Sequence, residues 1–335
     1  MITILDPNIG HSYLSFADFF DLNNPNEFVL YEDPEHSSPV DFLIQNHIAW
    51  HNDRCSKYKH KILLFVDTRH NYEDQIKSLV DKQHDRYLIT NAIDYTVTDE
   101  PKILFNDYLF NRTKSYYLNY PFSAKTKWYF CYQSDYVIPT VYEASSKNKI
   151  FVAPNNIGHE LIYRTKLKDF LKIKYMDYGY LGCPSDPTVG KLQPNTLLPA
   201  ASGYRPPANR YYEDSFISIY GETIEYGTTF AATEKTFDPL IKGHFILPFS
   251  NYKFIDFIKN HYGFKLPDFI DYSYDDIEDA ATRYEKYQDE IQRLLLLSLD
   301  EWRQYWTENL WIIKHNQQIF FDRPYHRTDL TSLLK

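Results

Sequence analysis

Thr233, Glu234 and Lys235 are the neighbouring residues of this sequence whose types best suit the binding of a charged ligand. They stand where a turn-rich segment gives way to a helical pattern. A helix N-terminus offers unpaired backbone N–H groups and a partial positive charge, which suit a phosphate. Lys235 would add a full charge to that phosphate, and Glu234 can accept hydrogen bonds from sugar hydroxyls. Thr233 also suits the N-cap of the helix, with Glu234 favoured in its first turn, and the two interpretations are compatible.

The segment around these three residues predicts a βαβ unit. An apolar run at residues 216–220 ends in Gly221, Glu222 and Thr223, and the helical pattern that follows stops at Gly243. A second apolar run then covers residues 245–249. Such a unit has parallel strands and a right-handed crossover, and ligands bind beyond the carboxyl ends of its strands. Glu222 is expected at one such end, facing the helix start.

The sequence of this segment resembles the donor-site motif of a known enzyme class. That motif is the signature of GT-B glycosyltransferases of the α1,3-fucosyltransferase and exostosin-like families, in their viral and bacterial forms, and the similar positions are residues 222–223, 233–239 and 243–246. The similarity extends to residues 263–264 and 271–275, then Ile277, Asp279 and Arg283. It covers about residues 150–320, less than half of them densely. The resemblance implies an α/β fold of two Rossmann-like domains that face a cleft, with C-terminal helices crossing between them.

The length of 335 residues favours two domains. We expect an acceptor-side α/β domain at 1–147, a nucleotide-sugar-binding α/β domain at 148–310, and a C-terminal segment at 311–335 that packs back towards the first domain. Apolar runs at residues 2–5, 27–31, 61–66, 87–90 and 102–105 predict strands in the first half. Nine of the ten glycines lie from Gly158 onwards, so the second half is the one expected to approach a ligand closely.

The resemblance implies a set of donor-binding residues in the second half. Arg164, on the helix predicted at 159–173, corresponds to an arginine that supports the donor pyrophosphate in these families. Residues 154–156 depart from the Ser-Asn motif that the families have before this helix. The planar guanidinium suits a phosphate; a solvated helix arginine is the alternative. The full set is Asn155, Arg164, Glu222, Thr223, Tyr226, Thr233, Glu234 and Lys235.

The implied reaction moves a sugar from a GDP- or UDP-linked donor to a hydroxyl acceptor, with inversion if a base acts directly. The base should come from the first half, where Asp67, Glu32 and His70 follow predicted strands; Asp67 is ranked first, and Asp33 and His11 are further candidates. No Asp-x-Asp follows an apolar run, so no metal and no cofactor besides the donor is expected. Asp275 and Asp276 are predicted as an acidic pair in the first turn of a helix.

The overall charge bears on the partner. The net charge of −9 disfavours a nucleic-acid surface, because affinity for nucleic acid comes mainly from cationic contacts with phosphates. The acceptor is therefore expected to be a glycan or another hydroxyl compound. Two alternatives stay open, namely a phage-type transferase acting on modified DNA bases, and a nucleotide-sugar-binding protein without turnover. The donor base, the sugar, the acceptor and the oligomeric state are not predicted.

The first residues contain no basic segment followed by an apolar run, and residues 294–297 are too short a run to span a bilayer. We therefore expect no signal peptide, no transmembrane segment, and a cytoplasmic setting in a bacterium or a virus-infected cell. Cys55, Cys131 and Cys183 have no zinc or disulfide spacing and are expected to be small buried hydrophobes.

Overall fold

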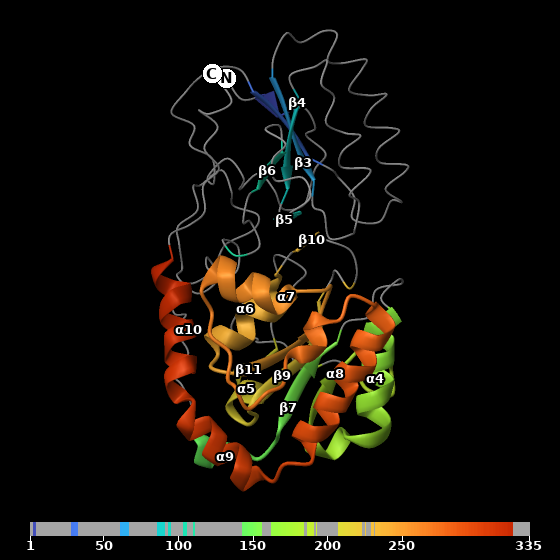
Figure 1. Ribbon diagram of the computed structural model, residues 1–335, viewed down its shortest axis with the longest axis vertical. Coiled ribbons are helices and arrows are strands. Elements are labelled where there is room, and N and C mark those ends of the chain that lie inside the picture. Colours follow the sequence, from blue (N-terminus) through green and yellow to red (C-terminus); the bar gives the residue numbers. More distant parts are fainter. Residues whose placement is uncertain are drawn as a thin grey trace.

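The structure is a computed structural model of residues 1–335 (Figure 1). It describes residues 143–155, 162–183, 186–190, 192, 207–222, 225, 229–230 and 232–323, together with Phe110 and the backbone of the short strands that precede it.

A parallel sheet of four strands organises the second half of the chain. Its order is β11-β9-β7-β8, with every neighbouring pair parallel. Pro248 lies in β11, an edge strand, where a missing N–H is tolerated. The strands are β7 (Phe151–Pro154), β8 (Gly179–Gly182), β9 (Ile217–Gly221) and β11 (Phe245–Phe249).

Both faces of this sheet are covered by helices, as the apolar character of its strands requires. Ile217 and Ile219 of β9 pack in one core with α4 and α8, whereas Tyr220 packs in another core with α6 and α10. Alternate residues of a strand point to opposite faces, so α4 and α8 cover one face and α6 and α10 the other (Figure 1). The helices are α4 (Ile162–Lys174), α5 (Asn209–Glu213), α6 (Glu234–Ile241), α7 (Phe254–Phe257), α8 (Ala280–Leu295), α9 (Leu299–Glu308) and α10 (Leu310–Asp322).

A second parallel sheet lies in the first half, in the order β1-β2-β3-β4-β6. Its strands are β1 (Thr3–Ile4), β2 (Phe28–Glu32), β3 (Lys61–Val66), β4 (Arg86–Thr90) and β6 (Ile103–Phe105). Two connections reach the second half. Strand β5 (Ile93–Asp94) pairs antiparallel with β10 (Thr229–Phe230), and Phe110 is buried against Phe237 of α6 and Phe320 of α10.

The predicted α/β class and parallel pairing are confirmed, and the strands predicted in the first half are present to within a residue at most ends. The helix predicted at 159–173 is described from Ile162. The division into domains at residues 147 and 310 stays a prediction. No helix among the described residues combines the length and apolar character that a membrane crossing needs. Of the cysteines, Cys183 is buried, as expected, whereas Cys55 and Cys131 lie outside the described residues.

One prediction was wrong. The helical spacing of apolar residues from Asp276 to about Asn316 predicts two long helices. Residues 280–322 instead form three, because Ser298 caps α9 with a capping box and Asn309 separates α9 from α10. As predicted, Asp275 and Asp276 are an acidic pair in the first turn of a helix, here the short 3₁₀ helix Ser273–Asp276. The carboxylate of Asp275 accepts a hydrogen bond from the N–H of Ile255 at the start of α7.

Candidate functional site

The order of the sheet creates a switch point between β7 and β9. From β7 the chain passes through α4 to β8 on one side, and it then returns to the other side of β7 to form β9 and β11. The loops that leave β7 and β9 therefore run in opposite directions and diverge at the carboxyl edge of the sheet. In open α/β folds this divergence is where ligands bind. Asn155 follows β7 and Glu222 follows β9.

Glu222 fixes the start of α6. Its carboxylate accepts hydrogen bonds from the backbone N–H of Thr233 at 3.1 Å, the hydroxyl of Thr233 at 2.7 Å and the hydroxyl of Thr236 at 2.6 Å. Glu222 is fully buried. Thr233 is the N-cap of α6, and its hydroxyl accepts from the N–H of Lys235. A buried carboxylate thus already stands against this helix start, and it positions the tripeptide that follows.

Lys235 lies at this helix start with little exposure to solvent. Its ammonium group donates to Glu234 Oε1 at 3.2 Å and to the hydroxyl of Thr233 at 3.3 Å, and its side chain is 14% exposed. Burial lowers the pKa of Lys235; the carboxylate of Glu234 raises it, the positive charge of Arg164 lowers it further, and Glu222 raises it. The positive charge of Arg164, in the first turn of α4, therefore acts on Lys235, in the first turn of α6.

Arg164 is held by the strands on both sides of the switch point. Its Nε donates to the carbonyl of Gly221 at 2.9 Å, and its own carbonyl accepts from Asn155 Nδ2 at 2.7 Å. The side chain packs closely on Gly221, where a Cβ atom would lie 2.8 Å from Arg164 Cγ. Arg164 is 5% exposed, so it is not the solvated helix arginine that the sequence left open.

Glu225 is a buried carboxyl at this edge that sequence reasoning missed. Its Oε2 accepts from the backbone N–H of Tyr163 at 3.4 Å, at the start of α4. Burial raises the pKa of Glu225 to about 7, against the opposing effects of Arg164 and the N–H groups of Tyr163 and Arg164. Nothing in its spacing marks Glu225, because its partners come from a helix about 60 residues earlier in the chain.

Arg283 braces the same loop from α8. Its guanidinium donates to the carbonyls of Ser250, Ile277, Glu278 and Glu225 at 2.7–3.1 Å, and it is 1% exposed. The sequence marked Arg283 only as part of the resemblance. Its contacts join the ends of β9 and β11 to α8, so it supports the edge rather than facing a ligand.

The fold therefore brings together six of the residues predicted from the sequence, namely Asn155, Arg164, Glu222, Thr233, Glu234 and Lys235. Thr223 and Tyr226 lie outside the described residues, as do Asp67, His70, Asp33 and His11. Glu32 is the last residue of β2, at a carboxyl end as predicted, and only its backbone is described.

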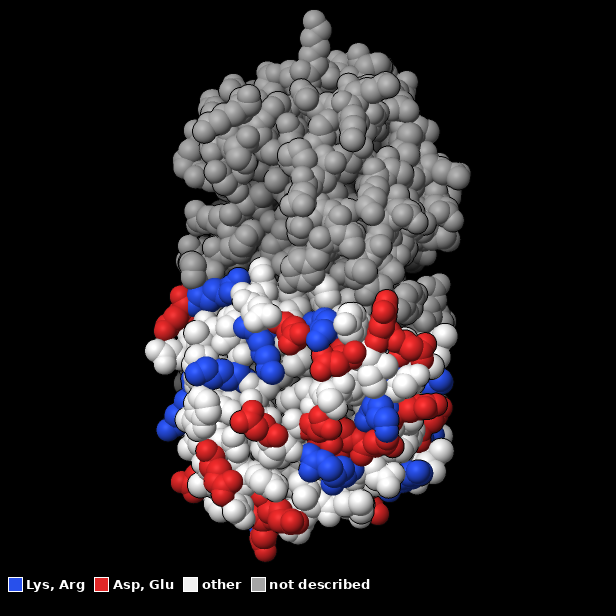
Figure 2. All heavy atoms as spheres, viewed as in Figure 1, with Lys and Arg blue, Asp and Glu red and all other residues white. Residues whose placement is uncertain are grey.

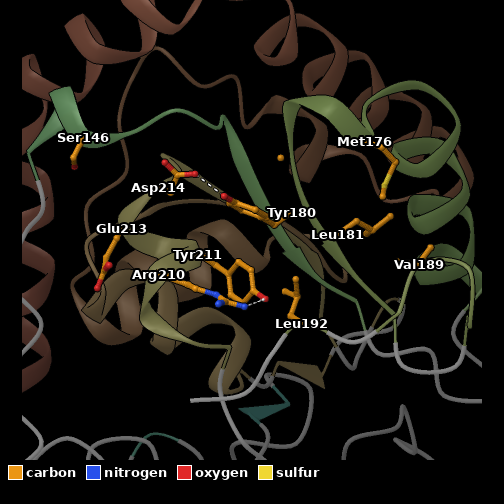
Figure 3. Close-up of a pocket in the computed structure, with 11 residues that line it drawn as sticks. Ser146, Met176, Tyr180, Leu181, Val189, Leu192, Arg210, Tyr211, Glu213 and Asp214 are labelled. Atoms are coloured by element: carbon orange, nitrogen blue, oxygen red, sulfur yellow. Dashed lines mark hydrogen bonds between the residues drawn. The ribbon is translucent and has the colours of Figure 1, made fainter. Parts of the chain in front are cut away.

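A separate cavity of about 870 Å³ lies along the edge strand β8 (Figure 3). Tyr180 donates to Asp214 at 2.5 Å and Arg210 donates to Tyr211 at 2.9 Å, so these polar groups pair with one another. Apolar residues complete the lining, with Leu192 beside Tyr211 and Met176 on the far side of Leu181. None of the described residues around it belongs to the set predicted from the sequence.

Charges of both signs intermingle on the described part of the face shown in Figure 2. No group of three or more potential metal ligands from His, Cys, Asp and Glu occurs among the residues that the structure describes. We compared the chain with protein-family models, with curated proteins and with solved structures, and none of the three comparisons gives a match.

Proposed function

We propose that this protein is a glycosyltransferase that binds the diphosphate of a nucleotide sugar at the switch point between β7 and β9 and transfers the sugar to a glycan or another hydroxyl acceptor. The observation that carries the proposal is that the end of β9 and the loop after it hold both cations at this edge. Arg164 donates to the carbonyl of Gly221, and the next residue, Glu222, holds Thr233, whose hydroxyl accepts from the N–H of Lys235. The charge of Arg164 also lowers the pKa of Lys235. The carboxylates of Glu234 and Glu222 offset part of this positive charge, and the phosphates of a donor would offset it further.

Each residue has a part in this scheme. Lys235 and Arg164 stabilise the negative charge that grows on the departing diphosphate, from positions fixed before the reaction begins. Glu234 accepts hydrogen bonds from hydroxyls of the donor ribose. Glu222 and Asn155 position these groups through their contacts with Thr233 and Arg164.

The proposed architecture is that of a GT-B enzyme, with the first half supplying the acceptor side of a cleft. Its support is the pairing of β10 with β5, because β10 follows the loop at the switch point. The carboxyl edge of the four-stranded sheet β11-β9-β7-β8 is thereby linked to a strand of the first half. The base that activates the acceptor would be Asp67, Glu32 or His70, and we propose an inverting transfer in the cytoplasm of a bacterium or a virus-infected cell.

A panel of GDP- and UDP-sugars tests the proposal. A ligand that binds only the folded protein raises its unfolding temperature, so a donor should give a concentration-dependent shift in a thermal scan. Release of the nucleoside diphosphate in the presence of acceptor then separates an enzyme from a binding protein. Shifts with none of the sugar nucleotides would refute the proposed function.

The substitution Lys235→Ala should weaken donor binding about tenfold to a hundredfold, because it removes a charge-assisted hydrogen bond to phosphate. Titration calorimetry with the donor found in the panel measures the effect, and circular dichroism checks the fold. Lys174→Ala is the matched control, since Lys174 is the last residue of α4, at the end of that helix away from Arg164. Equal affinity of Lys235→Ala and the control would show that Lys235 does not contact the donor.

A further inference from the structure

Two helices begin at the switch point, and a glutamate carboxylate stands against each start. Glu222 lies at the N-terminus of α6 and Glu225 at that of α4, and the two residues belong to the same loop after β9. Negative charge is favoured at a helix N-terminus. An incoming phosphate would therefore compete with one of these carboxylates for the same donors.

The two carboxylates are held with different strength. Both oxygens of Glu222 are bonded, by three donors at 2.6–3.1 Å. Glu225 accepts from Tyr163 N at 3.4 Å through Oε2, while its Oε1 is buried and has no hydrogen-bond partner among the described residues. A buried polar atom without a partner costs free energy, so the contact of Glu225 is the weaker of the two.

The site that Glu225 occupies has the features of an anion site. The helix behind it, α4, has 13 residues, and Arg164 lies in its first turn. The strand before it, β7, borders the switch point. Asn155, directly after β7, also carries a buried side-chain oxygen, Oδ1, without a hydrogen-bond partner in the described part of the chain. Backbone N–H groups and a guanidinium, which suit an anion, therefore lie at one helix start beside two buried acceptors without partners in the described part of the chain. A proton on Glu225 would turn its carboxyl group into a donor.

We propose that Glu225 is a place-holder whose carboxylate occupies the anion site at the start of α4 and gives up that site to a phosphate group of the ligand while taking up one proton from solvent. The proton forms the neutral carboxylic acid, so the dianion does not face a carboxylate. This inference rests on the proposed function only in taking a diphosphate as the natural ligand.

The charges around Glu225 fit this exchange. Arg164 and the N–H groups of α4 favour the carboxylate, whereas burial opposes it more strongly, which raises the pKa of Glu225 to about 7. From α8, Arg283 donates to the backbone carbonyl of Glu225, and Tyr284 also lies within the influence of its charge. The pKa of Tyr163 is raised, mainly by burial, and the charge of Glu225 contributes to that rise. Among the described residues, Arg164 is the cation that favours the carboxylate. A dianion that approaches Arg164 would offset its charge, so proton uptake and anion binding reinforce each other.

Sulfate is a suitable probe because it stays a dianion throughout the neutral range and needs no sugar or base. Its affinity is measured by intrinsic fluorescence at about pH 6 and about pH 8.5. Only the fraction with a neutral Glu225 competes well for binding, so the wild type should bind sulfate up to roughly 30-fold more weakly at the higher pH. Glu225→Gln should lose this dependence and bind at the higher pH as tightly as the wild type does at the lower pH.

Glu290→Gln is the matched control, because Glu290 is a buried glutamate of α8. Its carboxylate accepts hydrogen bonds from the backbone N–H of Asp271 and from the guanidinium of Arg293. It should behave as the wild type. A second measurement uses the wild type alone: calorimetric titration with sulfate in two buffers of different ionisation enthalpy should show uptake of about one proton at pH 8.

Three results would overturn the inference: no proton uptake, no loss of wild-type affinity at the higher pH, or Glu225→Gln binding no more tightly than the wild type there. The proposed function is judged separately. Proton-coupled sulfate binding without any response to sugar nucleotides would refute the proposed transferase and support the role of Glu225. Binding of a sugar nucleotide without proton-coupled sulfate binding would refute the role of Glu225 and leave the proposed transferase standing.

Discussion

Glu222 and Glu225 lie three residues apart in the loop after β9, and their carboxylates meet different helices. Glu222 is matched by three donors and is fully buried. It therefore serves to hold the start of α6, and Lys235 with it, in one position. Glu225 has an unsatisfied oxygen and a pKa raised to about 7, so it can change its protonation state and its contacts near neutral pH. The two glutamates thus have different roles, because the fold supplies three hydrogen-bond donors to Glu222 and fewer to Glu225.

Glu222→Gln should lower the free energy of unfolding by about 1–3 kcal/mol, because the amide nitrogen of glutamine would face donors that need an acceptor. Urea denaturation measures the loss. Glu285→Gln, on the exposed face of α8, is the control and should change stability by no more than about 0.5 kcal/mol. Equal stability of the two variants would contradict the bonding described for Glu222.

The position of strand β8 depends on a glycine, Gly179, which has no Cβ atom. Its sequence, GYLG, is short and begins and ends with glycine, so it carries little strand signal. Gly179 nevertheless pairs with Phe151, and a Cβ atom at Gly179 would lie only 2.4 Å from the carbonyl oxygen of Phe151. The glycine permits close contact between β7 and β8, and the position of β8 in turn creates the switch point beside β7.

Gly179→Ala should destabilise the protein by about 1–3 kcal/mol, since the backbone of β7 must shift to admit the methyl group. The same urea titration applies, with the exposed substitution Ser145→Ala as the control. An unchanged unfolding midpoint in Gly179→Ala would mean that the two strands do not approach each other as described.

The two halves of the molecule share part of one core. Phe110, from the first half, is fully buried, and its ring lies 5.4 Å from Phe237, 5.6 Å from Tyr262 and 4.9 Å from Phe320. Phe237 belongs to α6, whose first turn holds Lys235. Packing that joins the halves therefore reaches the helix that carries the candidate site.

Phe110→Ala should lower the free energy of unfolding by about 3–5 kcal/mol, through lost burial and the cavity left among three aromatic rings. Ile173→Ala is the control, because Ile173 is 79% exposed and should contribute little. If Phe110→Ala unfolds at the same urea concentration as the control, the shared core does not form.

The sequence by itself determined the elements whose signals are local. The apolar runs of the first half, the run at residues 245–249 and the start of α6 at Thr233 could be predicted, because strand runs and helix caps depend on residues close together in the chain.

The tertiary structure decided how those elements meet. That Arg164 lies against Gly221, that Glu225 stands at the start of α4, and that β8 lies beside β7 all depend on pairing between distant segments. Local spacing does not encode such pairing, because it is set by the sheet order and the packing of both faces.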